Sequence, residues 1–270
     1  MEQGLYLYCL ARLSRLPALP LEGVGLEETG RLHVTEFRDL AAVWSPVALA
    51  DFCGPQAEKH LEDLSWIGPR VIRHQEVVAG VMRHSPVLPA RFGTIFSTLA
   101  SLEKVLHRRH DTIAAVLERL ADREEWAVKG LLDRAMAKER LFLGKLAQEA
   151  ARLEDLSPGK RYFEEQRLRA ACDRELPRWL KEVRRELWAD LGRYATEARE
   201  RRLLPREVTG QVTEMIFNWA FLVLTRDVAP FQERIQAANA RLADFDLRLE
   251  CTGPWPPYSF CPVLDPEAVP

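Results

Sequence analysis

The sequence lacks the features that mark several large classes of protein. None of its apolar runs approaches the roughly 20 residues that a membrane-spanning helix needs. The residues after Met1 lack the basic start and the apolar core of a signal peptide, so we expect a cytoplasmic protein. Catalytic and nucleotide-binding motifs are missing as well: there is no Gly-x-Ser-x-Gly, no His-Glu-x-x-His, no dinucleotide fingerprint and no Walker loop.

Neither the charge nor the cysteines point to a ligand. The 38 basic and 40 acidic residues nearly balance, so no overall field favours nucleic acid or an anionic membrane. The cysteines are odd in number and contain no Cys-x-x-Cys pair: Cys9, Cys53, Cys172, Cys251 and Cys261. This pattern favours reduced thiols in the cytoplasm. We therefore predict no metal and no cofactor.

What is present fits a soluble globular protein of 270 residues, with 47% hydrophobic residues and a mean hydropathy of -0.22. In the first half, Leu5–Leu10 is apolar on both faces and predicts a central strand. The short runs 31–37 and 40–47 predict a hairpin around Arg38 and Asp39. Apolar residues every three or four positions predict helices over 66–84 and 102–120.

The second half alternates strands with long helices. We expect strands over 125–131, 215–224 and 245–251, and helices over 135–156, 160–202 and 227–242, with Pro177 dividing or kinking the second of these helices. This order resembles a ferredoxin-like unit with long helices inserted in its first crossover. The predicted fold is α+β with two domains. Residues 1–122 form an N-terminal α+β domain, and residues 123–270 form a C-terminal α+β domain with a helical hairpin and a tail rich in proline and aromatic residues.

That tail, Thr252–Phe260, contains three prolines and three aromatic rings. Proline fixes φ and removes a backbone donor, so we expect the tail neither to continue the preceding strand nor to form a helix. Exposed aromatic rings are unfavourable in water, and the tail is therefore expected to dock on its own domain or on a partner. Deleting Gly253–Pro270 should loosen or unfold the protein.

A second unusual stretch is Pro86–Phe96, whose prolines favour an edge strand or an irregular extended segment. Gly93 permits a backbone conformation that a side chain would forbid. Arg91 stands between apolar residues, and we expect its guanidinium to be partly buried and to hold a loop. From this stretch and the tail we predict structural contacts, in preference to partner contacts, for Arg91, Phe92, Gly93, Trp255, Pro256, Pro257, Tyr258 and Phe260.

Three places in the sequence could in principle carry a metal site, a proton-transfer group or a nucleophile. His74 lies on the apolar stripe of the 66–84 helix, where a hydrogen-bonded, half-buried histidine is preferred to a metal or proton-transfer role. His107 and His110 could share a metal with Asp111, but the two arginines between them favour a solvated charged face. Cys172, near two arginines, is the one candidate nucleophile. No residue is assigned as catalytic, cofactor-binding or metal-ligating.

Two blocks of the sequence are specific enough to suggest a family. They are Leu-Pro-Ala-Arg-Phe-Gly-Thr at 88–94 and Gly-Pro-Trp-Pro-Pro-Tyr-Ser-Phe at 253–260. Together with Leu5–Tyr8, Glu125–Lys129 and Asn218–Val223, they occur in the order and at the spacing of one family. On these residues the whole chain resembles the gas vesicle protein F/L family (GvpF/GvpL). Ala90 and Phe221 depart mildly, standing where a larger aliphatic residue and a tyrosine are expected.

The resemblance implies a non-enzymatic accessory protein of gas vesicle formation with two α+β domains. Its partners would be the small hydrophobic gas vesicle shell protein (GvpA-like) and other gas vesicle accessory proteins, bound in the cytoplasm during assembly. A second interpretation is a minor structural component of the mature vesicle. A third is an enzyme with a cryptic site at His74 or Arg91.

Overall fold

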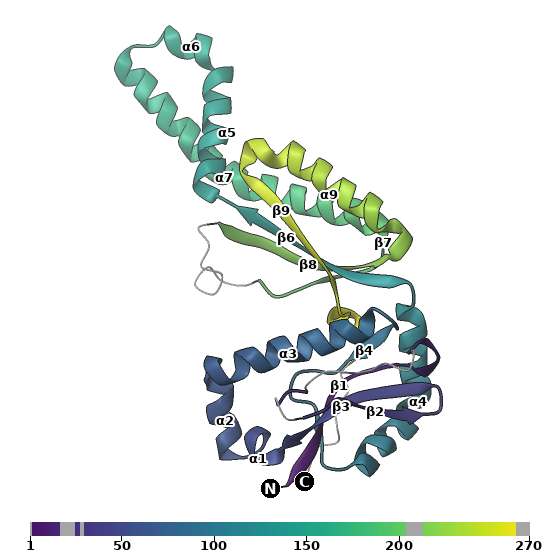
Figure 1. The fold of residues 1–270 in the computed structure, drawn as a ribbon. Helices are drawn as coiled ribbons and strands as arrows, with labels where there is room; N and C mark the ends of the chain where they lie inside the picture. The colour runs from purple at the N-terminus through teal and green to yellow at the C-terminus, as the bar shows by residue number, and fades with distance from the viewer. Residues whose placement is uncertain (1, 17–24, 28–29, 204–212, 263–270) are drawn as a thin grey trace. The chain divides into compact units, whose positions relative to one another are not determined.

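The computed structural model describes residues 2–16, 25–27, 30–203 and 213–262, which form two compact units (Figure 1). The first unit combines the described residues up to Glu124 with those from Trp255 onward. The second unit runs from Glu125 to Pro254. Each unit consists of an antiparallel sheet with helices packed on it, so the expected α+β fold with two parts is observed. The tail was expected to belong to the C-terminal domain, whereas its residues from Trp255 onward group with the first unit.

The sheet of the first unit has β1 at its centre. Its strands are β1 (Gln3–Arg12), β2 (His33–Phe37), β3 (Leu40–Ala48) and β4 (Val87–Pro89), in the order β2-β3-β1-β4. The hairpin expected at Arg38 and Asp39 joins β2 to β3, with Arg38 at φ 55°. Both faces of β1 are buried, as its apolar composition predicts.

The two faces of this sheet carry separate apolar clusters. Helix α3 (Leu64–Met82) packs over the face that holds Tyr6 and Tyr8. Helix α4 (Leu99–Leu120) packs over the opposite face, against Leu7 and Leu10. Side chains alternate along a strand, and the irregular register between Leu7 and Cys9 resets that alternation. Two short helices, α1 (Leu49–Phe52) and α2 (Pro55–Glu62), precede α3.

The edge beside β1 is broken by a turn. β4 pairs with the second half of β1, and β5 (Ile95–Phe96) pairs with Leu5 and Tyr6. Between them, Ala90 and Thr94 still bond to the backbone of β1, residues 91–93 turn away from it, and Gly93 adopts a φ of 84° that suits glycine. An edge position tolerates prolines because the outer backbone groups need no strand partner. The expectation of an edge strand in this stretch is confirmed.

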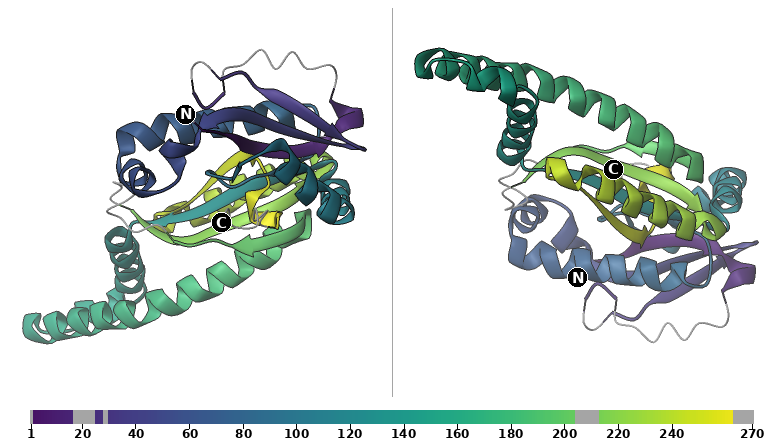
Figure 2. Two further views of the ribbon diagram at one scale, coloured as in Figure 1. Left: turned by 90° about the horizontal axis from the view of Figure 1, so that it is seen from below. Right: turned by 90° about the horizontal axis from the view of Figure 1, so that it is seen from above.

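The sheet of the second unit has the same strand order as the first. Its strands are β6 (Arg123–Leu132), β7 (Ala195–Glu200), β8 (Glu214–Leu224) and β9 (Leu247–Trp255), in the order β7-β8-β6-β9. In both sheets the order is second, third, first and fourth strand, which is the ferredoxin-like arrangement. Helices α7 (Pro158–Leu191) and α9 (Val228–Leu242) contribute to one apolar core with the sheet and lie over the same face of it (Figure 2).

The inserted helices form a hairpin within the first crossover. Helices α5 (Arg134–Gln148) and α6 (Ala150–Glu154) run out from β6, and the long α7 returns (Figure 1). Ion pairs join the two arms: Lys138 with Asp173 at 2.6 Å, Lys145 with Glu175 at 2.6 Å and Arg169 with Glu139 at 2.9 Å. These pairs are partly exposed, so each contributes little on its own.

Three boundaries in this unit differ from the sequence-based expectations. The helix expected over 135–156 is interrupted at Glu149, where φ is -97° and ψ is 3°. The helix expected over 160–202 passes Pro177 undivided and ends at Leu191, and the expected helical residues 195–200 form strand β7 instead. β7 contains few typical strand residues, and its pairing with β8 outweighs its local preference.

The third difference concerns the tail. β9 continues through Gly253 and Pro254 to Trp255, although we expected the prolines to end the strand earlier. β9 is an edge strand, and one of its sides needs no backbone donor. Sheet pairing therefore extends further than the sequence indicates.

A glycine in β6 provides close packing in this core. A Cβ atom built on Gly130 would lie 2.3 Å from the ring of Phe217. The break that Gly130 makes in the apolar alternation of β6 is therefore where an aromatic ring of β8 approaches the backbone.

Candidate functional site

The most elaborate buried polar cluster of the first unit is centred on His74 in α3. Asp63 caps the N-terminus of this helix, and its side chain accepts a hydrogen bond from the Ser65 backbone at 2.8 Å. His74 lies on the same face as Val77, Val78 and Val81, and its exposed fraction is 3%. Instead of being half-buried, as the sequence suggested, the imidazole is almost fully enclosed. Buried imidazole nitrogens need hydrogen-bond partners, and both have one.

The two partners of His74 are tyrosines from opposite ends of the chain. Nδ1 lies 2.9 Å from the hydroxyl of Tyr6 in β1, and Nε2 lies 2.9 Å from the hydroxyl of Tyr258 in the tail. The backbone N–H of Gly93 donates to the Tyr6 hydroxyl at 3.3 Å. With that acceptor position used, Tyr6 can donate its proton to Nδ1, and the N–H of a neutral imidazole then stands at Nε2, facing Tyr258.

Aromatic rings surround this chain of hydrogen bonds. The ring of Tyr6 lies 5.0 Å from that of Tyr8 and 5.8 Å from that of Phe92, centroid to centroid. His74 lies 6.0 Å from the ring of Phe92 and stacks on Tyr8 at 5.7 Å. These separations are typical of favourable aromatic pairs. We call Tyr6, Tyr8, His74, Phe92 and Tyr258 the His74 cluster.

The His74 cluster is electrically neutral near pH 7. Burial lowers the pKa of His74 to about 4, against the opposing effect of a hydrogen bond to the Ala90 backbone. Burial raises the pKa of Tyr8 to about 12 and also raises the pKa of Tyr6 and Tyr258. A histidine that stays neutral with both nitrogens occupied is poorly suited to proton transfer at neutral pH. These hydrogen bonds instead join three segments of the first unit: strand β1, helix α3 and the tail.

The predicted residues of the 86–96 stretch have different environments. Phe92 contacts the His74 cluster, and Gly93 supplies the donor to Tyr6. The side chain of Arg91 is exposed, so the expectation that it is partly buried is wrong. Its carbonyl accepts from the backbone and the hydroxyl of Thr94, at 3.1 and 2.8 Å, and this backbone contact closes the turn.

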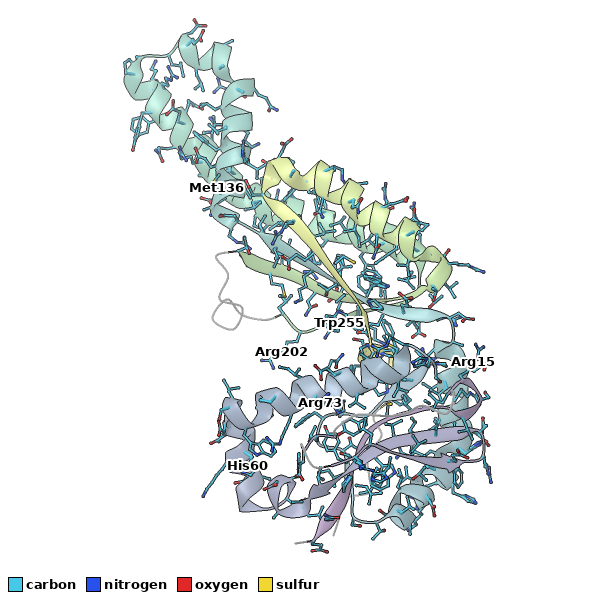
Figure 3. All side chains as sticks on the ribbon, viewed as in Figure 1. Arg15, His60, Arg73, Met136, Arg202 and Trp255 are labelled. Carbon is cyan, nitrogen blue, oxygen red and sulfur yellow. The ribbon has the colours of Figure 1, made fainter. Side chains whose placement is uncertain are left out.

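The predicted tail residues also divide by burial. Trp255 stands at the end of β9 with 42% of its surface exposed (Figure 3). Pro256 and Pro257 are buried, and Phe260 is 1% exposed. The Phe260 carbonyl accepts from the guanidinium of Arg119 in α4 at 2.6 Å. The tail residues after Trp255 thus pack within the first unit, with Tyr258 completing the His74 cluster.

His110, proposed from the sequence as a possible metal ligand, is hydrogen-bonded to neighbouring side chains. His110 is bonded to Asp111 at 2.9 Å and to Asp39 at 2.5 Å, and Asp39 also pairs with Arg12. The flank of α4 is therefore a bonded network and not only a solvated face. Among the residues that the structure describes, no group of three or more His, Cys, Asp or Glu side chains could hold a metal ion.

Cys172 does not have the accessible setting that a nucleophile needs. Its side chain is 2% exposed, and burial raises the pKa of its thiol. The proposal from the sequence that Cys172 is a candidate nucleophile is wrong, because burial disfavours the thiolate.

Sequence reasoning singled out Phe92, Gly93, Tyr258 and His74 separately but did not bring them together. Tyr6 was recognised as part of a strand and of the family resemblance, but not as a partner of His74. The one available signal was compositional: tyrosine and histidine on otherwise apolar faces must find polar partners when buried. Nothing local specifies that those partners are 68 and 184 positions apart.

Comparison with known proteins agrees with this fold over nearly the whole chain. Residues 4–262 match the model of the gas vesicle synthesis protein GvpL/GvpF family, and the chain belongs to that family. Gas vesicle protein L of Streptomyces sp. (strain CB03234) is 28% identical over 231 residues, which cover 85% of this chain and 82% of that protein.

Two solved structures share the fold. The crystal structure of the gas vesicle protein GvpF from Anabaena sp. PCC7120 matches with a TM-score of 0.68 and 19% identity, covering 97% of this chain and 100% of that one. Gas vesicle protein GvpF from Microcystis aeruginosa matches with a TM-score of 0.65 and 19% identity, covering 96% and 99% of the two chains.

Proposed function

We propose that this protein is an accessory factor of gas vesicle formation that binds the hydrophobic shell protein, other gas vesicle accessory proteins, or both during assembly. The observation that carries the proposal is membership of the GvpL/GvpF family across residues 4–262. The site of action is the cytoplasm, in association with growing gas vesicles. No helix among the described residues has the length and hydropathy to cross a bilayer.

The physical reason for such a factor is the apolar surface of an unassembled shell subunit. A polypeptide with a large exposed apolar surface aggregates unless a partner covers that surface. Helix faces and sheet edges are the usual surfaces for such contacts. This protein offers edge strands at β2 and β7 and exposed apolar side chains such as Ile72 and Phe163.

The proposed role is binding and not catalysis. The polar groups of the His74 cluster are neutral near pH 7 and bonded to one another, and Tyr258 and His74 serve to hold the tail. The residues predicted from the sequence as structural contacts, including Arg91, Trp255 and Phe260, are proposed to stabilise the fold and not to contact a partner.

Co-purification tests this proposal directly. The tagged protein is co-expressed with the shell protein and purified under native conditions, beside an equally tagged, unrelated ferredoxin-like domain as control. We expect the shell protein to be retained only by the family member. A folded bait that retains neither the shell protein nor any other gas vesicle accessory protein would overturn the assembly role.

The second candidate function is a minor structural component of the mature vesicle. The same family membership supports it. Washing purified vesicles with increasing urea separates the two roles: an assembly factor leaves the vesicle fraction, whereas an integral component remains with the shell.

A further inference from the structure

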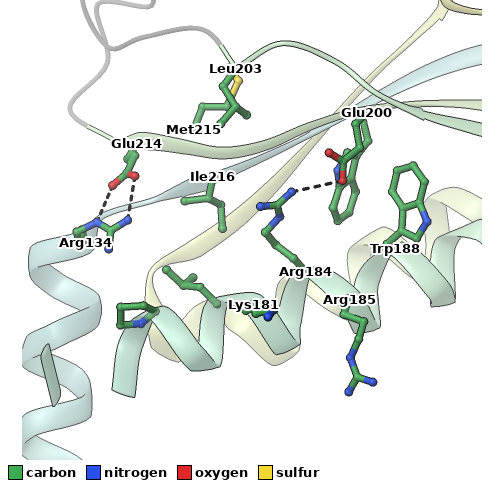
Figure 4. A pocket seen from close by; sticks show the side chains of 13 residues that line it. Arg134, Lys181, Arg184, Arg185, Trp188, Glu200, Leu203, Glu214, Met215 and Ile216 are labelled. Atoms are coloured by element: carbon green, nitrogen blue, oxygen red, sulfur yellow. Dashed lines mark hydrogen bonds and ion pairs between the residues drawn. The ribbon is translucent and has the colours of Figure 1, made fainter. Parts of the chain in front are cut away.

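The second unit contains a groove between α7 and one end of β7 and β8. Its volume is about 530 Å³, within the roughly 300–1,000 Å³ typical of ligand sites. The groove is lined by both apolar and charged side chains: Arg134, Leu180, Lys181, Arg184, Arg185, Trp188, Glu200, Leu203, Glu214, Met215, Ile216 and Trp219, with Pro177 beside them (Figure 4). All of these residues belong to the second unit.

The apolar part of the lining comes from the core of that unit. Leu180, Ile216 and Trp219 are buried members of the main apolar cluster. Leu203, which follows β7, is 46% exposed and extends the apolar surface outward. An apolar side chain entering the groove would therefore exchange water for contacts with these residues.

The charged part of the lining has an excess of basic groups. Arg134 holds Glu214 through two hydrogen bonds of 2.7 and 2.9 Å, and Arg184 reaches Glu200 at 3.4 Å (Figure 4). Both acidic side chains of the groove are thus engaged. The guanidinium of Arg185 points away from the strands, whereas Lys181 lies on the helix with no ion pair among the described residues. The groove is therefore suited to an anionic group.

One residue of the lining also carries a buried donor without an acceptor. The indole Nε1 of Trp219 is buried and donates to no acceptor among the residues that the structure describes. Trp219 itself is 1% exposed and lines the groove. Leaving a buried donor without an acceptor is unfavourable, and a ligand oxygen that reached the indole N–H would relieve that cost.

We propose that this groove binds a polypeptide segment in which an Asp or Glu side chain is flanked by apolar residues. The carboxylate accepts from the Trp219 indole and is attracted by Lys181, while the flanking apolar side chains cover Leu203 and Ile216. The inference deepens the proposed function, and rests on it, by naming a surface and the chemistry of the partner segment.

The test uses the full chain and a pair of blocked peptides, acetyl-Ala-Leu-Glu-Leu-Ala-amide and its counterpart with Gln in place of Glu. The indole N–H resonance of Trp219 is identified by its absence from the Trp219→Phe variant. We expect the Glu peptide to move this resonance downfield to saturation and to bind at least tenfold more tightly than the Gln peptide. Affinities of all variants are measured by calorimetry.

Two variants and one control locate the binding. Lys181→Gln and Trp219→Phe should each weaken binding of the Glu peptide at least threefold. Arg178→Gln removes an exposed charge from the same helix outside the groove and should leave the affinity unchanged. Octanoate serves as a carboxylate with an apolar chain and no peptide group.

Several outcomes would overturn the inference: equal binding of the two peptides, no binding of either, affinities unchanged in both groove variants, or a response to octanoate without one to the Glu peptide. The last would assign the groove to small carboxylic acids. The co-purification experiment is independent of these results, so failure of the peptide test leaves the proposed function standing.

Discussion

The hydroxyl of Tyr258 lies 2.9 Å from Nε2 of His74, a residue 184 positions earlier in the chain. The other imidazole nitrogen is held by Tyr6, so His74 joins the central strand β1 to the tail. Because all three groups are largely buried, each depends on the others for its hydrogen bonds. This hydrogen bond makes the tail a structural part of the first unit.

Replacing Tyr258 with Phe should lower the free energy of unfolding by about 1–3 kcal/mol, because the buried Nε2 of His74 loses its partner. Urea denaturation followed by circular dichroism measures the change. Tyr162→Phe removes a hydroxyl from a side chain that is 58% exposed, and this control should stay within about 0.5 kcal/mol of the parent. Equal effects of the two substitutions would contradict a stabilising contact between Tyr258 and His74.

His74 should also make stability depend on pH. Burial lowers its pKa from 6.5 to about 4, so the unfolded chain binds the proton more readily between these values. The contribution of His74 is therefore complete above pH 6.5 and is lost as the pH falls toward 4. Its size is on the order of 3 kcal/mol. The free energy of unfolding of the parent should fall more steeply over this range than that of His74→Gln.

His110 serves as a control because its pKa is shifted in the direction opposite to that of His74. Hydrogen bonds to Asp111 and Asp39 raise its pKa, so its contribution is present below pH 6.5 and is lost as the pH rises through the raised value. His110→Asn should therefore change the profile on the other side of pH 6.5. If the parent and His74→Gln gave parallel profiles, the neutral buried state assigned to His74 would be wrong.

Phe260→Ala should be strongly destabilising, by about 3–5 kcal/mol, because the ring is almost fully buried and its removal leaves a cavity. Phe163→Ala removes the same atoms from a ring that is 74% exposed and should change stability little. Melting temperatures of both variants give the comparison. Deletion of the chain from Gly253 onward should lower the melting temperature further, and an unchanged value would show that the tail is not needed for the fold.

Gly130→Ala should destabilise the second unit by about 1–3 kcal/mol, since the added methyl group would overlap the ring of Phe217. The matched substitution Gly144→Ala places a methyl group in open space within α5, where it should stabilise by up to about 1 kcal/mol. Guanidinium denaturation of the two variants should move the midpoint in opposite directions. A neutral Gly130→Ala would mean that the ring of Phe217 can move aside to admit the methyl group.

Much of the fold was predictable because the spacing of apolar residues within single segments indicates helices and strands. The two-sided apolar run of β1, the stripe of α3 and the apolar run of β8 each indicated the correct element. β7 was missed because it is an edge strand without a buried residue and with few apolar ones, and its sequence is equally acceptable in a helix. α7 runs past Pro177 undivided: Leu176 and Leu180 on either side of it are buried in the core of the second unit, and this packing outweighs the local cost of the proline.

The sites were less predictable because they depend on contacts between distant residues. The apolar stripe of α3 placed His74 toward a core, but its tyrosine partners come from β1 and from the tail. The groove of the second unit combines residues of α5, α7, β7 and β8, and no short motif marks it. Only the packing of these elements brings the basic groups of α7 together with Trp219, whose indole N–H has no acceptor among the described residues.

The division of the first unit between the two ends of the chain has a consequence for biosynthesis. During translation the N-terminal residues leave the ribosome first, so β1 and α3 emerge long before Tyr258 and Phe260 have been made. The whole second unit must be synthesised in between. A nascent chain therefore cannot form the bond between Nε2 of His74 and Tyr258 until residue 258 has been made and has left the ribosome, and the first unit is completed last although its synthesis begins first.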